Sequence, residues 1–103
     1  MRIFTLFIGT SQTDARDVIV GIVGRQFESF TIIAGTGCFR GETEPTWLVK
    51  LATDDVDKII QTAAAIRQAL HQEGVGIEHN GRYYRCTATD AASELLLTMN
   101  REA

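Results

Sequence analysis

The segment from Gly35 to Pro45 gathers the side chains of this sequence that are best suited to ligand recognition. It reads Gly-Thr-Gly-Cys-Phe-Arg-Gly-Glu-Thr-Glu-Pro and lies between two apolar runs. The guanidinium of Arg40 can bind a phosphate, and the adjacent aromatic ring of Phe39 can form one wall of a pocket. The glycines allow the backbone to approach a ligand closely. We therefore predict a polar recognition loop, with an ion pair from Arg40 to Glu42 or Glu44 as the alternative.

Other kinds of chemistry have less support in the sequence. Glu42 and Glu44 are two residues apart, so on a strand they would share a face and could hold a divalent ion or act as acid and base. Solvated carboxylates are the simpler interpretation. Cys38, Cys86 and the two distant histidines match no zinc spacing, and the sequence contains no phosphate-binding loop or nucleophile elbow. We expect free thiols, no metal and no cofactor.

The composition is that of a single globular domain covering residues 1–103. Hydrophobic residues make up 45% of the 103 positions and charged residues 22%, which suffices for one core but not two. The net charge of −3 argues against DNA or RNA as a partner, because such binding requires a basic surface. The sequence shows no apolar run long enough for a membrane span and no export signal, so we expect a cytoplasmic protein without membrane contact.

The first half of the chain predicts a strand, a helix and two further strands. Residues Arg2–Gly9 are rich in β-branched and aromatic side chains, with Phe4, Leu6 and Ile8 on one face. A helix capped by Ser11 or Thr13 should run to about Phe27. Its core face combines the residues Ala15, Val18, Ile19, Ile22 and Val23. The runs 30–34 and 47–51 are the next two strands, and Pro45 belongs at the end of the loop or on a sheet edge.

The second half predicts a helix, a hairpin and a terminal helix. The helix begins near Thr53 or Asp54 and ends at about Gln72, where Gly74 stops it. Its apolar stripe comprises Val56, Ile59, Ile60, Ala63, Ile66 and Leu70. Strands at 75–78 and 83–87 flank Asn80-Gly81, a pair that favours a tight turn. A terminal helix at 90–100 belongs to a C-terminal extension covering residues 89–103.

This order of elements indicates an α+β fold of the ferredoxin-like, split β-α-β type. It consists of an antiparallel sheet with two main helices, an added hairpin and a C-terminal helix. The fold hosts enzymes and binding proteins alike, so it does not assign a function. We expect the following residues to be buried: Leu6, Ile19, Ile22, Val49, Ile59 and Ile66.

Several features also predict a homo-oligomer, a dimer or higher. The first strand is apolar on both faces, so helices should cover one face and a partner or the terminal helix the other. Gly21 and Gly24 lie on the outer side of the first helix, where a neighbouring backbone could approach; tolerated weak positions are the alternative. The hairpin and the terminal helix, with Leu95, Leu96 and Met99, are typical of elements that embrace a neighbour.

Several segments together resemble a group of small phage and prophage proteins. The resemblance rests on Phe4–Gly9 with residues 30–32, on residues 35–46, and on residues 72–75 after the second helix, and it spans about residues 3 to 78. Those proteins carry a Gly-aromatic-x-Gly-x-x-Glu segment, then a strand, a helix and a Gln-Glu pair before the last strand. Within the group, the sequence is most similar to the first type of Thoeris anti-defence protein. Those are oligomeric sponges that bind cyclic ADP-ribose signals without cleaving them.

The resemblance implies a function and a set of binding residues. The function is non-catalytic sequestration of a small phosphorylated nucleotide-like ligand, a signal of the cyclic ADP-ribose kind. Such sequestration would antagonise immune signalling in the host cytoplasm. The matching ligand-binding positions are Phe39, Arg40, Gly41, Glu44, Gln72 and Glu73, and Phe39 stands where a larger aromatic is common. Apart from the resemblance, Arg25 and Arg82 could add charge to the pocket from the same chain or a neighbour.

Two other classes of function stay open. One is a small ferredoxin-like enzyme that uses Glu42, Glu44 or His79 as acid or base. The other is a phage structural or interaction protein without a ligand. A binding protein returns its ligand unchanged after denaturation, whereas an enzyme returns product. Because no catalytic motif stands out, the sequence favours binding over catalysis.

Overall fold

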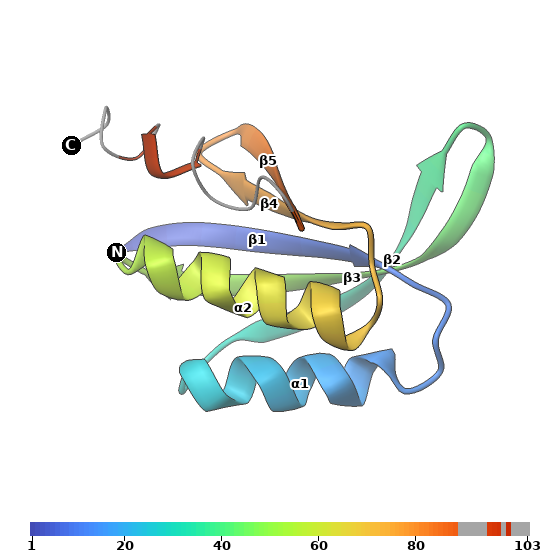
Figure 1. Ribbon diagram of the computed structural model, residues 1–103, viewed down its shortest axis with the longest axis horizontal. Helices are drawn as coiled ribbons and strands as arrows, with labels where there is room; N and C mark the ends of the chain where they lie inside the picture. Colours follow the sequence, from blue (N-terminus) through green and yellow to red (C-terminus); the bar gives the residue numbers. More distant parts are fainter. Residues whose placement is uncertain (89–94, 98, 100–103) are drawn as a thin grey trace.

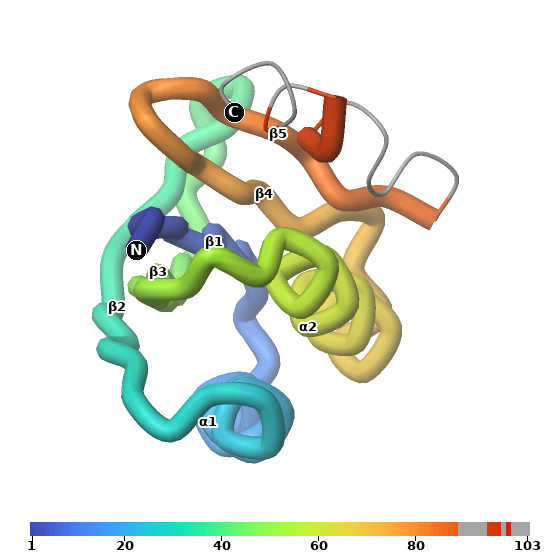
Figure 2. The backbone as a smooth tube through the Cα atoms, turned by 90° about the vertical axis from the view of Figure 1, so that its left-hand side faces the viewer, coloured from blue at the N-terminus to red at the C-terminus, as the bar shows by residue number. Residues whose placement is uncertain are grey.

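The computed structural model describes residues 1–88, 95–97 and 99 of the chain. They form a sheet with two helices on one of its faces (Figures 1 and 2). The elements in chain order are β1 (Arg2–Gly9), α1 (Ala15–Gln26), β2 (Thr31–Phe39), β3 (Glu42–Thr53), α2 (Val56–Ala69), β4 (Gly74–His79) and β5 (Arg82–Thr87).

The sheet confirms the predicted ferredoxin-like fold. Its strand order is β2-β3-β1-β4-β5, and every neighbouring pair is antiparallel. The first four strands in this order have the split β-α-β arrangement, and β5 extends the sheet as the second arm of the added hairpin. Two crossovers of the same hand place α1 and α2 on the same face, as the view in Figure 2 shows.

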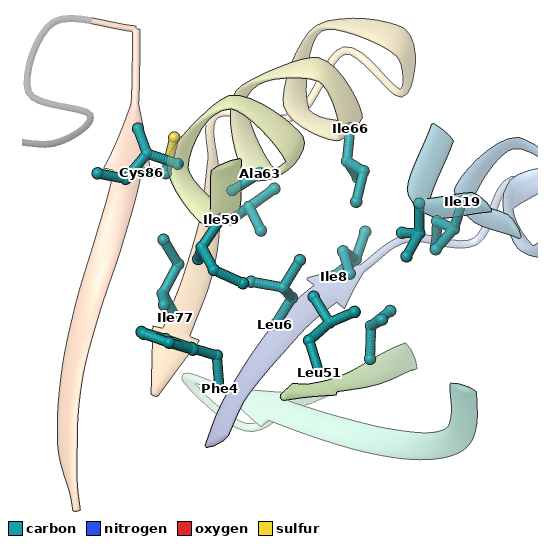
Figure 3. Packing of buried hydrophobic residues seen from close by; sticks show 14 of the residues in the cluster. Phe4, Leu6, Ile8, Ile19, Leu51, Ile59, Ala63, Ile66, Ile77 and Cys86 are labelled. Atoms are coloured by element: carbon teal, nitrogen blue, oxygen red, sulfur yellow. The ribbon is translucent and has the colours of Figure 1, made fainter. Parts of the chain in front are cut away.

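The core lies between the helices and the central strand. Phe4, Leu6 and Ile8 alternate along β1 and are fully buried against the helices (Figure 3). Burying a large apolar side chain contributes roughly 1.5–3 kcal/mol. The predicted stripe of α2 is buried along its whole length, and five of the six expected core residues are buried. The exception is Ile22, which is half-buried and packs at the margin of the core.

The two ends of α2 are capped in different ways. At the start, Oδ1 of Asp55 accepts a hydrogen bond from the backbone N–H of Lys58 at 3.0 Å. At the other end, His71 adopts a left-handed backbone with φ of 53°. The N–H of His71 donates to Gln68 O at 3.3 Å and that of Gln72 to Arg67 O at 2.9 Å, the pattern of a Schellman cap. The predicted stop at Gly74 was therefore wrong: His71 ends the helix and Gly74 begins β4.

Helix α1 begins later than predicted and offers an open outer side. Asp14, not Ser11 or Thr13, occupies its N-cap, and its side chain makes no capping bond. A Cβ added at Gly21 or Gly24 would meet nothing within 4 Å. Within the described part of this chain no backbone approaches these glycines, so close packing there would require a second molecule.

The described residues of the terminal segment belong to the core of their own chain. Residues 95–97 and 99 are helical, while the rest of the predicted helix at 90–100 lies outside the described residues. Leu95 and Met99 are buried in the main cluster and Leu96 packs against it. The prediction that these side chains embrace a neighbour was wrong, because the helix side of the sheet leaves an apolar surface for them to cover.

The capping bond at Asp55 provides a test of the helix boundaries. We expect Asp55→Ala to lower the free energy of unfolding by about 1 kcal/mol, because it leaves an N–H of the first turn of α2 unpaired. The matched control is Asp14→Ala, which removes a carboxylate with no capping bond at the start of α1 and should cost clearly less. Urea denaturation, monitored by circular dichroism, measures the free energy of unfolding of both variants. Equal losses in the two variants would contradict the assignment.

Candidate functional site

The predicted recognition loop is a β-hairpin arm. Residues 35–45 continue the paired strands β2 and β3, with Gly35 opposite Thr46 and Phe39 opposite Glu42. Only Arg40 and Gly41 form the turn, with φ of 51° and 81°, the values of a two-residue type I′ hairpin. The prediction of a loop was wrong because Gly35 and Gly37 make room for side chains of β3. The hydroxyl of Thr46 lies over Gly37 and Leu48 lies over Gly35.

The arm projects beyond the body of the molecule. The pairing of β1 with β3 ends at Gly9 and Thr46, so residues 36–45 form a two-stranded ribbon that rises away from the sheet in Figure 1. At its base, the N–H of Thr10 donates to Pro45 O at 2.9 Å. In an antiparallel strand the N and the O of one residue point toward the same neighbouring strand. Pro45 has no N–H to donate, and its N points to the side where β1 has already ended. The predicted edge position of Pro45 is confirmed.

The tip of the arm presents an aromatic ring and a cation to solvent. Phe39 is 72% exposed, so in this chain it is not a core residue. The guanidinium carbon of Arg40 lies 5.0 Å from the centre of the Phe39 ring, within the range of a cation–π contact. Among the residues that the structure describes, the only ion pair joins Arg16 and Asp17. The alternative of an ion pair from Arg40 to Glu42 or Glu44 is therefore not realised.

The face of the sheet opposite the helices, called the open face below, carries apolar side chains. It presents Ile3, Thr5 and Phe7 of β1, and the pairing extends it to residues of every other strand. No described element covers it, and Ile3 is 57% exposed. Apart from the arm, the large apolar and aromatic residues that are exposed or half-buried on this face are Ile3, Phe7, Ile33, Leu48 and Tyr83. The first strand thus has the two apolar faces that its sequence predicted, and the described part of the terminal helix packs on the other side.

Three glycines leave bare patches of backbone on the open face, and each patch is covered by a longer side chain. A Cβ added at Gly9 would collide with the carboxylate of Glu44, one at Gly74 with the guanidinium stem of Arg85, and one at Gly76 with the ring of Tyr83. These side chains therefore lie along the sheet, and Glu44, Tyr83 and Arg85 remain exposed to solvent on their outer side. The ring of Tyr83 also meets that of Phe7, with centroids 6.1 Å apart.

The covered glycines gather a carboxylate, a guanidinium and two aromatic rings at one end of the open face. Because β1 and β4 are antiparallel, the end of β1 at Gly9 and the start of β4 at Gly74 lie at the same end of the sheet. The base of the arm, with Glu44, meets the sheet there. This end of the open face is the candidate site. A carboxylate and a guanidinium at the same end of an aromatic surface suit a ligand with charges of both signs.

The structure brings together only part of the predicted binding set. Glu44 and the Gln72-Glu73 pair lie at the same end of the sheet. The amide of Gln72 donates to Leu70 O at 3.2 Å, and Gln12 donates to the same oxygen at 2.7 Å, so Gln72 helps to close the end of α2. Glu73 is exposed. Binding by any of these residues stays a prediction.

Arg25 and Arg82 lie at the opposite end of the sheet from the arm. Helix α1 starts beside the end of β1 and runs back along it, as Figure 1 shows. Arg25 belongs to the last turn of α1 and therefore lies at the far end. Arg82 pairs with His79, whose other partner is Phe4 near the start of β1. Neither arginine reaches the candidate site within one chain.

Sequence reasoning missed Tyr83, Arg85 and Phe7. A signal was present: Gly74 and Gly76 alternate with Val75 and Ile77, which predicts a strand with one apolar face and one bare face. What the pattern did not reveal is which neighbouring side chains would lie across that bare face.

The remaining side chains considered for catalysis or metal binding are those of His79, Cys38 and Cys86. His79 is buried, its ring stacks on Phe4 at 4.8 Å, and its Nδ1 lies 3.1 Å from Ile3 O. Cys38 is exposed and Cys86 is buried, and both are free thiols. Burial raises the pKa of Cys86, and the charge of Arg67 opposes that shift. Among residues 1–88, 95–97 and 99, no three His, Cys, Asp or Glu side chains gather as a metal site, and no helix has the length and apolarity to cross a membrane.

A groove lies at the far end of the sheet, away from the candidate site. It has a volume of about 650 Å³ and lies between the N-terminus, the segment after α1 and the start of α2. Lys50 and Lys58 line it together with Phe27 and Phe30, and the Nζ of Lys58 lies 5.4 Å from the centre of the Phe27 ring. None of the predicted binding residues lines this groove.

Comparison with known proteins shows a likeness in fold. No family model matches the chain, and no curated protein matches it. Among solved structures, the fold is similar to that of a phage SAM lyase in its apo state, with a TM-score of 0.60. The two sequences are 22% identical, over 86% of this chain and 90% of that one. At this identity the likeness establishes the shared fold.

Proposed function

We propose that this chain binds S-adenosylmethionine at the candidate site and cleaves it as a lyase does, without water. One observation carries the proposal: the carboxylate of Glu44 lies flat over Gly9, at the end of the open face that also holds the Phe7 and Tyr83 rings. The sulfonium of S-adenosylmethionine is a cation, which a carboxylate and aromatic rings attract. The rings also offer an apolar surface to the adenine. The likeness in fold to a phage SAM lyase supports this choice of ligand.

The proposed reaction needs no group beyond the ligand itself. An oxygen of the ligand's own carboxylate attacks its Cγ, a C–O bond forms as the C–S bond breaks, and the electron pair moves to the sulfur. The products are homoserine lactone and 5′-methylthioadenosine, with no water, proton or redox partner consumed. The task of the protein is then to hold the flexible ligand in the reactive geometry. Glu44 orients the cation. The proposal thus shares catalysis with the enzyme alternative that the sequence left open, but Glu44 does not act as an acid or a base in it.

The reaction is tested by incubating the purified protein with S-adenosylmethionine and following 5′-methylthioadenosine by chromatography. We expect wild type to form this product and Glu44→Gln to lose roughly ten- to hundredfold in kcat/KM, the effect of removing one charged contact. The matched control is Glu42→Gln, an exposed carboxylate farther along the arm, which should retain the wild-type rate. If wild type forms no product and binds no S-adenosylmethionine in calorimetry, the proposed function is wrong.

We further propose that the chain is a homo-oligomer in which a second copy covers the apolar part of the open face. Ile33 and Leu48, which pair on β2 and β3, form that part together with Ile3 farther from the arm, and large exposed apolar patches are uncommon on monomers. The neighbour would close over the edge of the candidate site and shield it from water.

Light scattering at micromolar concentration tests the assembly. Wild type should have the mass of a dimer or a larger oligomer. Ile33→Asp should shift it toward the monomer, because a charge would be buried in the interface. Leu97→Asp is the control, since Leu97 is an exposed leucine outside the sheet, and it should leave the mass unchanged. A monomeric wild type would refute the proposal.

Sequestration of a cyclic ADP-ribose-type signal is the second candidate function, and the tip of the arm favours it. The guanidinium of Arg40 rests over the exposed Phe39 ring, a combination that suits a phosphate next to a base. Gly41 leaves the turn beside them without a side chain. Either function would remove an adenosine-derived molecule from a host cell, which agrees with the anti-defence role that the sequence resemblance implies.

For the second candidate, we expect Arg40→Ala to weaken cyclic ADP-ribose binding by about 1.5–3 kcal/mol, or roughly ten- to hundredfold, with nearly unchanged Tm. Titration calorimetry measures the affinity, and chromatography after denaturation should return the ligand intact. Arg16→Ala removes an exposed arginine of α1 and serves as control. Failure of wild type to bind any cyclic nucleotide or ADP-ribose derivative would exclude sequestration of this class, and equal binding by the Arg40 variant would place the site elsewhere.

A further inference from the structure

Arg85 lies in the candidate site although no sequence motif marks it. It pairs with Gly76 across β4 and β5, and Gly76 pairs with Phe7, so its side chain belongs to the open face. The side chain then turns along the sheet toward Gly74. A Cβ at that position would lie 3.0 Å from Cγ and 3.1 Å from Cζ of Arg85. The bare glycine therefore lets the guanidinium lie against the backbone of β4.

The guanidinium of Arg85 is not neutralised by the neighbouring acids. Within the described part of the chain, the only ion pair joins Arg16 and Asp17. Glu78 on the adjacent strand uses its Oε2 to accept from Gly81 N at 3.0 Å, at the turn that closes the far end of the hairpin. Glu44 covers Gly9. Arg85 thus presents its donors to whatever lies on the open face, and a guanidinium pairs best with a carboxylate or a phosphate.

We propose that Arg85 binds the carboxylate of the ligand's amino-acid end and thereby selects adenosyl ligands that carry this group. The inference rests on the proposed function and assigns a specificity-determining residue to it. Neighbouring strands lie about 4.8 Å apart, so an amino-acid group can span from the Arg85 side of the site to the Glu44 side. Its carboxylate then faces the guanidinium and its positive charges face the carboxylate of Glu44.

Two stable ligands isolate the contribution of the amino-acid end. S-adenosylhomocysteine carries this end, and 5′-methylthioadenosine has the same thioether and nucleoside without it. We expect wild type to bind S-adenosylhomocysteine more tightly in titration calorimetry. Arg85→Gln should reduce that affinity roughly ten- to hundredfold and leave the affinity for 5′-methylthioadenosine unchanged. Arg85→Lys should recover part of the loss, because it restores the charge but not the planar fork.

Two further variants separate this role from a general effect on the fold. Gly74→Ala keeps Arg85 but displaces its side chain through the added Cβ. It should weaken the binding of S-adenosylhomocysteine and leave that of 5′-methylthioadenosine unchanged. Arg16→Gln, on the exposed side of α1, should change neither affinity. If Arg85→Gln lowers the affinity for both ligands equally, or for neither, Arg85 does not bind the carboxylate. That outcome leaves the proposed function standing. If wild type binds neither ligand nor S-adenosylmethionine, the proposed function fails and this inference with it.

Discussion

The alternation of side chains along β1 is the constraint on which the rest of the molecule depends. Burial of Phe4, Leu6 and Ile8 under the helices commits the intervening residues to the opposite face, because successive side chains of a strand point to opposite sides. Antiparallel pairing with β3 and β4 carries the same division across the sheet. Glu44, Arg85 and Tyr83 therefore share a face for the same reason that the core is on the other one. A register shift of one residue would exchange the two sets.

The glycines of the open face act together with the side chains that cover them. Gly9, Gly74 and Gly76 have little value for sheet propensity, since glycine packs nothing and is entropically costly in a strand. Their contribution is space, which Glu44, Arg85 and Tyr83 occupy from neighbouring strands. The arm uses glycine in the same way at Gly35 and Gly37, whereas at Gly41 the requirement is conformational because φ is positive. Glycine in this chain thus has two distinct physical roles.

The two candidate functions differ in the charge that the ligand brings. A pyrophosphate is strongly anionic and would meet the carboxylate of Glu44 at the base of the arm, whereas Arg40 at the tip would attract it. S-adenosylmethionine carries charges of both signs and matches a surface on which Glu44 and Arg85 lie at the same end of the sheet. The fold does not choose between the two ligands, since ferredoxin-like domains host many unrelated functions. The distribution of charge over the open face is therefore more informative than the topology.

Much of the architecture was readable from local pattern. The stripe of α2, the alternation of β1 and the Asn80-Gly81 turn each arise from residues close in sequence, and together they predicted the ferredoxin-like order. Errors arose where distant residues decided the outcome. Gly35 to Pro45 forms a hairpin because β2 and β3 pair across it, and the terminal Leu95 and Met99 enter the core of their own chain because the helix side of the sheet had room for them.

The candidate site likewise combines features that follow from local sequence with features that only the tertiary structure decided. The sequence by itself determined that Arg40 and Phe39 stand together in one segment and that Glu44 would share the face of Glu42 on a strand, since both follow from spacing along that segment. Only the tertiary structure separated Arg25 and Arg82 from the arm and brought Arg85 and Tyr83 to the glycines of β4. The physical reason is that contact across a sheet depends on strand order and register, which are properties of the whole packed domain and not of any one segment.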